Sequence, residues 1–103
     1  MPSSLSVAAN ARLGANAGEN LSTQFSVQAQ FSIQAGAEPG VMPRVMELFA
    51  KRGLVPDFWH SAVSGAALSI EIRVAGVERD TVDYIARCAR QIVGVDTVLT
   101  ASD

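Results

Sequence analysis

Only one histidine and one cysteine, His60 and Cys88, offer side chains of the types that most often perform nucleophilic or metal chemistry. A nucleophile needs a base within hydrogen-bond reach, and a structural zinc ion needs about four ligands. No acidic or sulfur partner at a spacing typical of a triad or a metal site can be assigned to either residue, and GxxxxGK[ST], GxSxG and HExxH motifs are absent from the sequence. We therefore expect a protein that is not an enzyme, with no metal, no cofactor and structural roles for His60 and Cys88.

Composition narrows the class of protein further. The chain has 103 residues, 49% of them hydrophobic, which is enough for one globular domain with its own core. The net charge is −2 and the eight Lys and Arg residues are scattered, so nucleic acid is not an expected partner. No apolar run approaches the roughly 20 residues of a membrane span, and the N-terminus lacks a secretory pattern. With a single cysteine, these features favour a reducing, cytoplasmic location.

The elements that must position any site follow from the hydrophobic periodicity. Strict alternation predicts a strand over 24–35 with one polar face, and a change to helical spacing predicts a helix from about Gly40 that Gly53 ends. A second strand is expected over 54–63, where Pro56 favours an edge position, and a third over 68–74, ended by Gly76. Asp80 is the expected N-cap of a second helix, and Gly94 its expected end.

A short last strand over 95–100 completes the order βαββαβ. The expected apolar stripes of the two helices comprise Val41, Val45, Leu48 and Phe49 in the first, and Val82, Ile85, Ala86, Ala89, Ile92 and Val93 in the second. Each helix has one apolar stripe, and the strands have one polar and one apolar face. This pattern predicts an α+β, ferredoxin-like sandwich, with both helices on one face of a four-stranded antiparallel sheet. Right-handed crossovers give the strand order 4-1-3-2.

The first 22 residues differ in composition from the rest. They are rich in Ser, Ala, Asn and Gly, so we expect a flexible N-terminal arm over 1–22 and a domain over 23–103. A period-2 pattern from Leu5 to Leu13 leaves open that part of the arm pairs as a strand on a sheet edge.

The segment from Pro39 to Gly53 reads PGVMPRVMELFAKRG and carries a family resemblance. This segment resembles the opening of an ACT domain, in which a Pro-Gly pair is followed by a hydrophobic helix and then by a basic residue and a glycine. More narrowly, the segment is similar to the small regulatory subunit of acetohydroxyacid (acetolactate) synthase, with the pattern G-hydrophobic-L-x-R-V-x-x-L-F-x-x-R-G. The run QIVGVDTV, from Gln91 to Val98, agrees in layout with that family. The resemblance covers about residues 25–100.

This resemblance implies a regulatory subunit in branched-chain amino acid biosynthesis, which modulates a large, thiamine-diphosphate-dependent catalytic subunit and itself holds no cofactor. It places a small amino-acid effector near the first strand-to-helix connection, at Gly36, Ala37, Glu38, Gly40 and Val41. Ala37, Val55 and Pro56 replace the amide-bearing positions of family members that bind branched-chain amino acids. Backbone N–H groups at Gly40 and Val41 remain available to a carboxylate.

The resemblance also implies a side-by-side homodimer in which the sheet continues across two chains. Arg44 matches an arginine of the family pattern and is a candidate interface residue. Phe58 and Trp59 are further candidates, because neighbouring strand residues face opposite ways and only one of the two rings can enter the core.

Two other functions stay open. A stand-alone ACT-like sensor would dimerise and bind an amino acid without an enzyme partner, and a bare ferredoxin-like module would serve in assembly. RNA binding ranks last, because the polar face of the first strand lacks paired aromatic residues.

Overall fold

The structure is a computed structural model that describes residues 26–103. The expected arm over 1–22, and the first residues of the expected first strand, lie outside the described residues. The elements in chain order are β1 (Ser26–Gly36), α2 (Val41–Ala50), β2 (Phe58–Ser64), β3 (Ala67–Glu78), α3 (Arg79–Arg90) and β4 (Val95–Ser102).

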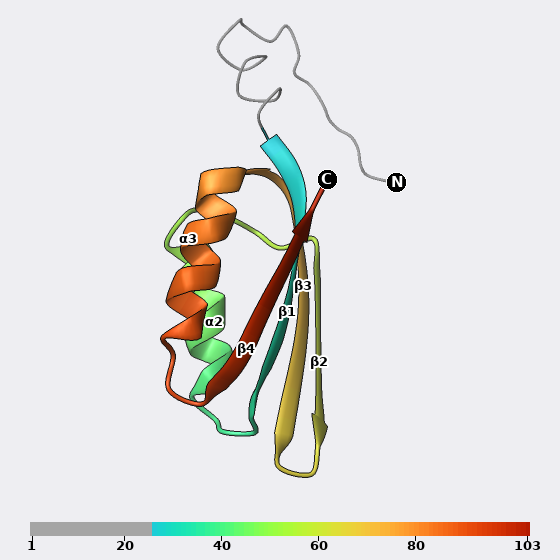
Figure 1. Ribbon diagram of the computed structural model, residues 1–103, viewed down its shortest axis with the longest axis vertical. Coiled ribbons are helices and arrows are strands. Elements are labelled where there is room, and N and C mark those ends of the chain that lie inside the picture. The colour runs from blue at the N-terminus through green and yellow to red at the C-terminus, as the bar shows by residue number, and fades with distance from the viewer. Residues whose placement is uncertain (1–25) are drawn as a thin grey trace, which may run out of the picture.

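The sheet has the order β2-β3-β1-β4, and all three strand pairs are antiparallel. Figure 1 shows both helices on one side of the sheet and none on the other. The predicted βαββαβ sandwich and its 4-1-3-2 strand order are therefore confirmed. Strand β2 is an edge strand, as expected.

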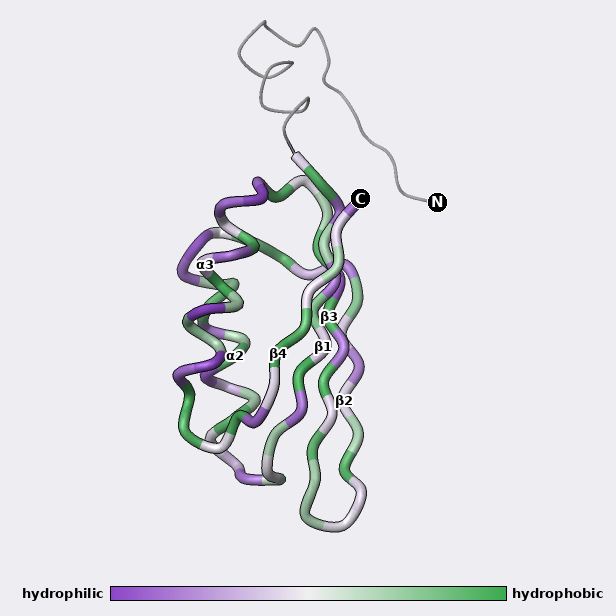
Figure 2. The backbone as a smooth tube through the Cα atoms, viewed as in Figure 1, coloured by the Kyte–Doolittle hydropathy of each residue, from purple (hydrophilic) through white to green (hydrophobic). Residues whose placement is uncertain are grey.

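The core lies between the sheet and the two helices. Along β1 and β3 buried and more accessible residues alternate, and Figure 2 shows the matching alternation of hydrophobic and hydrophilic colour. Phe31 of β1 meets Phe49 of α2 edge to face, with ring centroids 5.2 Å apart. The buried hydrophobic residues are Val27, Ala29, Phe31, Ile33, Ala35, Val41, Val45, Phe49, Leu68, Ile70, Ile72, Val74, Val77, Val82, Ile85, Ala86, Ala89 and Val98.

Helix α2 follows the predicted pattern closely. Its buried residues are Val41, Val45 and Phe49, and Leu48 is partly buried against the core. Gly53 ends the helix region with a φ of 69°, a conformation that glycine adopts without steric cost.

Strand β2 begins later than predicted. Pro56 lies before the strand, and the Asp57 N–H donates to the Arg73 carbonyl oxygen over 2.8 Å. Because proline has no N–H to donate, the hydrogen-bonded ladder starts only after it. The prediction of a strand over 54–63 was thus wrong at its first residues.

Gly76 does not end β3. It has a φ of 69° and lies where the register with β1 shifts between Val27 and Ala29, so it forms a bulge and the strand continues to Glu78. Helix α3 starts directly at Arg79, with Glu78 in the N-cap position, so the prediction of an Asp80 cap was wrong. Asp80 lies in the first turn, where its charge still favours the helix dipole.

Helix α3 ends at Arg90, earlier than predicted. The Gln91 and Ile92 N–H groups donate to Cys88 and Ala89 carbonyl oxygens, which tightens the last turn. Ile92 and Val93 therefore belong to the connection to β4, and Val93 is 84% exposed. Gly94, with a φ of 100°, shapes this connection and does not cap the helix.

Candidate functional site

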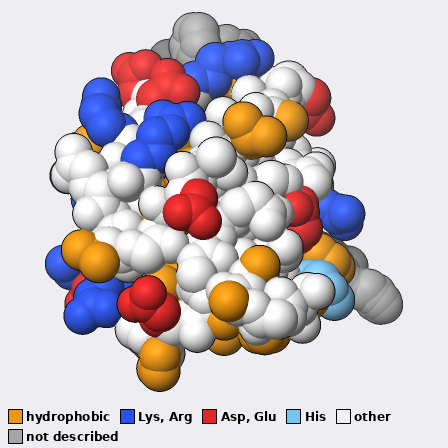
Figure 3. Space-filling model, turned by 60° about the horizontal axis from the view of Figure 1, so that its bottom comes forward, with side chains coloured by type: hydrophobic (Ala, Val, Ile, Leu, Met, Phe, Trp, Pro, Cys, Tyr) orange, Lys and Arg blue, Asp and Glu red, His pale blue; other side chains and the backbone are white. Residues whose placement is uncertain are grey.

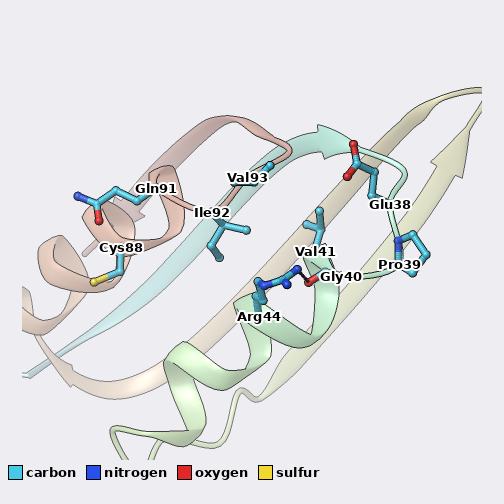
Figure 4. A pocket seen from close by; sticks show the side chains of 9 residues that line it. All are labelled: Glu38, Pro39, Gly40, Val41, Arg44, Cys88, Gln91, Ile92 and Val93. Carbon is cyan, nitrogen blue, oxygen red and sulfur yellow. Dashed lines mark hydrogen bonds between the residues drawn. The ribbon is translucent and has the colours of Figure 1, made fainter.

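A groove of about 580 Å³ opens where the first turn of α2 lies beside the last turn of α3 (Figure 4). Its walls come from the β1–α2 connection, from both helices and from the α3–β4 connection. The lining residues are Glu38, Pro39, Gly40, Val41, Arg44, Cys88, Gln91, Ile92 and Val93. This volume is typical of sites for small organic ligands.

The groove contains some of the predicted effector residues. Glu38, Gly40 and Val41 line it. Gly36 and Ala37 do not: their N–H groups donate to the carbonyl oxygens of Gly94 (2.8 Å) and Ala66 (2.9 Å). These two residues hold the β1–α2 connection in place, and the side chains available to a ligand come after them.

Arg44 covers the start of α2. Its Nη1 donates to the Gly40 carbonyl oxygen over 3.1 Å, one helical turn back. The guanidinium also occupies the space that a Cβ at position 40 would take. Glycine at this position therefore lets the Arg44 side chain lie flat against the N-terminus of the helix.

The wall opposite α2 approaches closely as well. A Cβ at Gly94 would lie 3.2 Å from Cγ2 of Val41 and 3.8 Å from the carboxylate carbon of Glu38. Gly94, Val41 and Glu38 are therefore neighbours, although Gly94 is far from the other two in sequence. A glycine at position 94 allows this approach and the positive φ at once.

Two opposite charges flank an apolar centre in the groove. Figure 4 shows the Val41 side chain between Glu38 and Arg44, with Ile92 and Val93 on the α3–β4 side. Within 26–103, neither Glu38 nor Arg44 takes part in an ion pair. Both charges are exposed and available to a ligand that carries its own charges.

Sequence reasoning missed the contribution of Cys88, Gln91, Ile92 and Val93 to this groove. The prediction assigned Ile92 and Val93 to the apolar stripe of a longer helix, and nothing in the spacing indicates that the end of α3 meets the start of α2. Cys88 is a free cysteine, partly buried at the groove wall.

The two neighbouring aromatic residues of β2 separate as predicted. Trp59 pairs with Ile72 and packs against the core, whereas Phe58 faces the other side of the sheet and is 39% exposed. The ring of Phe58 stacks on His60 at 6.5 Å, with the Arg73 guanidinium carbon 4.4 Å from its centroid. Their role in an interface remains a prediction, as does that of Arg44.

Residues 26–103 contain neither a cluster of metal-binding side chains nor a membrane-spanning helix. No group of three or more His, Cys, Asp or Glu side chains that could hold a metal ion occurs within 26–103. No helix in the described part of the chain has the length and apolar character to cross a membrane.

The family model of the ACT-like domain matches residues 22–102. The chain belongs to the ACT-like domain family. A comparison with curated protein sequences finds no match.

Solved structures agree in fold. The ACT domain of GTP pyrophosphokinase from Chlorobium tepidum has a TM-score of 0.66 at 13% identity, over 74% of this chain and 99% of that one. An ACT domain protein from Streptococcus pneumoniae gives 0.61 at 18%, over 75% and 90%. The regulatory subunit of aspartate kinase from Thermus thermophilus gives 0.57 at 18%, over 74% of this chain and 54% of that one. At identities of 13–18%, these structural similarities show a shared fold.

Proposed function

We propose that this chain is a non-catalytic regulatory module that binds a small amino acid in the groove between α2 and α3. The observation that carries the proposal is the placement of Glu38 and Arg44 on either side of an apolar centre. Membership of the ACT-like domain family, and a fold shared with an aspartate kinase regulatory subunit, support a regulatory role.

The groove suits a zwitterion with an apolar side chain. The carboxylate of the ligand would bind the Arg44 guanidinium, and its ammonium group would bind the Glu38 carboxylate. The side chain of the ligand would lie on Ile92 and the exposed Val93, whose side chains offer only apolar atoms, with the buried Val41 beneath them. Glu38 and Arg44 are both exposed, and water weakens ion pairs at exposed sites. We therefore expect the affinity to be modest, and the two opposite charges to select for a zwitterion.

Calorimetric titration with branched-chain amino acids tests this proposal. Binding to the wild-type chain should weaken in both Arg44→Ala and Glu38→Gln. Glu47→Gln is the matched control, because Glu47 lies on α2 outside the main groove and pairs with Lys51 at 3.9 Å. If no amino acid binds, the amino-acid proposal fails.

The narrower form of the proposal is a small subunit of the acetohydroxyacid synthase type, with a thiamine-diphosphate-dependent catalytic subunit as partner. The support is the R-V-x-x-L-F-x-x-R-G pattern from Arg44 to Gly53. Packing against the sheet accounts for Val45 and Phe49 of this pattern. Arg44 and Arg52 stay on the surface, Arg52 with its guanidinium carbon 4.2 Å from the ring centroid of Tyr84.

The alternative is a stand-alone homodimeric amino-acid sensor without an enzyme partner. One observation favours it. The apolar residues Val45 and Phe49 of the family pattern are buried in the core of this chain, so few residues of the pattern remain on the surface to bind a partner. In both forms we propose a side-by-side dimer through the free edge of β2, where Val63 is 64% exposed.

A pull-down from the native lysate, with and without branched-chain amino acids, separates the two forms. Recovery of a thiamine-diphosphate enzyme whose activity the chain changes would support the regulatory subunit. Recovery of this chain alone would favour the sensor. For the dimer, Ser61→Pro on the edge strand should abolish edge pairing, and an unchanged dimer would contradict it.

A further inference from the structure

We propose that the outer surface of the two helices binds an acidic segment of another protein. The inference rests on the regulatory role proposed above and names the chemistry of the partner, but it does not depend on an amino acid in the groove. The residues that carry it are Lys51, Arg52, Tyr84 and Arg87, and we call them the basic surface. None of the four lines the groove, so the partner and the amino acid can bind at the same time.

The fold gathers positive charges that are scattered along the sequence. Six of the eight Lys and Arg residues lie within 41–52 and 78–90, and all six are exposed: Arg44, Lys51, Arg52, Arg79, Arg87 and Arg90. The same two segments carry four carboxylates, Glu47, Glu78, Asp80 and Asp83. Six positive and four negative charges give the helix layer a net charge of +2, whereas the whole chain has −2. In Figure 3 most of the blue side chains lie on the left, the side on which Figure 1 shows the helices. An acidic partner is therefore attracted to this side of the molecule.

Two arginines meet at one aromatic ring where the end of α2 lies beside the middle of α3. The guanidinium carbon of Arg52 is 4.2 Å from the ring centroid of Tyr84, and that of Arg87 is 5.7 Å from it. Attraction between a cation and a ring restrains these long side chains. A guanidinium on a ring face keeps N–H groups at its edge, and these can donate to a carboxylate. The ring thus positions two cations for an incoming anion.

Neither of these two guanidinium groups has an acidic partner in the part of the chain that the structure describes. Over 26–103 the one ion pair joins Lys51 to Glu47, and the side chains of Arg52 and Arg87 donate no hydrogen bond. The other arginines of the helices donate to oxygen atoms of Gly40 (from Arg44), of Ser102 and Asp103 (from Arg79) and of Val98 (from Arg90). Two like charges beside one ring repel each other. A carboxylate from a partner would offset this repulsion and accept from the free N–H groups.

The residue types of the basic surface are typical of protein interfaces. Arginine and tyrosine are among the types most enriched where a few residues dominate the binding energy. The Tyr84 ring is 42% exposed and offers apolar area between the charges. Carboxylates also match the fork of a guanidinium, with which they form two parallel hydrogen bonds.

The carboxylates within the helix layer favour a protein over a nucleic acid as the partner. Asp83 lies one turn before Arg87 on α3, and Glu47 lies one turn before Lys51 on α2. A nucleic acid is negative along its whole length, so its phosphates would meet these carboxylates as well as the arginines. A protein segment can instead place its Asp and Glu residues only where the arginines lie.

A fluorescently labelled peptide of ten glutamates measures how well the basic surface binds carboxylates. Anisotropy titrations with the full chain at low ionic strength give the dissociation constant. Arg52→Gln and Arg87→Gln should each weaken binding about two- to fivefold. The matched control is Arg73→Gln, which removes the same charge from the sheet face that carries no helix, the open face (Figure 1). This control should leave the affinity unchanged.

Three outcomes of these titrations would overturn the proposal. Equal losses in Arg52→Gln and Arg73→Gln would mean that the peptide responds only to net charge. Tighter binding of single-stranded DNA with the same number of charges would make a nucleic acid the better occupant. The third outcome is an absence of peptide binding to the wild-type chain.

Calorimetry with branched-chain amino acids separates this proposal from the one for the groove. The Arg52→Gln/Arg87→Gln chain should bind amino acids as the wild type does, because neither residue lines the groove. Loss of amino-acid affinity in this variant would overturn the separation of the two sites. Conversely, an absence of amino-acid binding to the wild-type chain leaves the result with the glutamate peptide intact.

Lys51 gives a second test, because it is the only lysine of the chain and lies next to Arg52. A carbodiimide condenses the lysine amine with a nearby carboxylate to an amide and is itself converted to a urea. The full chain carries Glu47→Gln, because Glu47 would otherwise take up the cross-link. In native lysate, mass spectrometry should find Lys51 joined to an Asp- or Glu-rich segment of a different protein, and the added substitutions Arg52→Gln and Arg87→Gln should abolish this product. A product that persists in that variant, cross-links only to a second copy of this chain, or no cross-link at Lys51 would overturn the proposal.

Discussion

The Arg44 guanidinium donates to the carbonyl oxygen of Gly40 and fills the space that a side chain at position 40 would occupy. The Arg44 guanidinium can therefore lie at the start of α2 only because residue 40 has no Cβ. The glycine at position 40 thus positions the Arg44 guanidinium, which is the positive charge that the proposed ligand would bind.

Gly40→Ala should displace Arg44 with little loss of stability. The φ of −81° at this residue is ordinary for any amino acid, and the arginine side chain is flexible, so we expect a change in unfolding free energy below about 1 kcal/mol. Amino-acid affinity should fall, as measured by calorimetry. In the Gly40→Ala/Arg44→Ala double variant the two losses should not add, and full additivity would show that the residues act independently.

Gly94→Ala should destabilise the protein more than Gly65→Ala. Both glycines have positive φ, but an added Cβ at Gly94 would press on Val41, whereas at Gly65 nothing lies within 4 Å. We expect a loss of about 1 kcal/mol at Gly65 and of about 2–3 kcal/mol at Gly94 in urea unfolding. Equal losses of unfolding free energy in the two variants would mean that the α3–β4 connection shifts easily away from Val41 to make room for the added Cβ.

Phe49→Ala should cost about 3–5 kcal/mol of unfolding free energy, because it removes a buried ring that packs edge to face on Phe31. Met46→Ala, on the exposed side of the same helix, should change stability by less than about 1 kcal/mol. Thermal and urea unfolding of the two variants provide the comparison. A small effect at Phe49 would contradict the packing of α2 described above.

Trp59→Ala and Phe58→Ala should separate stability from association. Trp59 packs against the core, so its loss should lower the unfolding free energy by about 2 kcal/mol or more. Phe58 faces the open side, so its loss should mainly reduce self-association in sedimentation. Reduced association with unchanged stability in Trp59→Ala would reverse these assignments.

Much of the fold was predictable because each element has its own local signal. The alternation along β1 and β3 and the apolar stripe of α2 describe faces that meet one core, and the structure confirms them. The errors fall where a boundary depends on a neighbouring strand. The bulge at Gly76 is defined by the register with β1, and the glycine by itself reads equally well as a strand end.

The candidate site was predictable only in part. Glu38, Gly40 and Val41 follow from the family pattern around one connection. Cys88, Gln91, Ile92 and Val93 reach the same groove because α3 ends at Arg90 and the chain turns back toward α2. The Gly36 N–H donates to the Gly94 carbonyl oxygen, and this bond between residues far apart in sequence joins the α3–β4 connection to the end of β1.

The most direct test of the central claim is a titration of the isotope-labelled full chain with valine, leucine and isoleucine, followed by amide chemical shifts in NMR spectra. The account predicts saturable shifts that centre on residues 38–44 and 88–94 and disappear in Arg44→Ala. Absence of saturable shifts with any amino acid, or shifts that centre on the open face of the sheet, would contradict it.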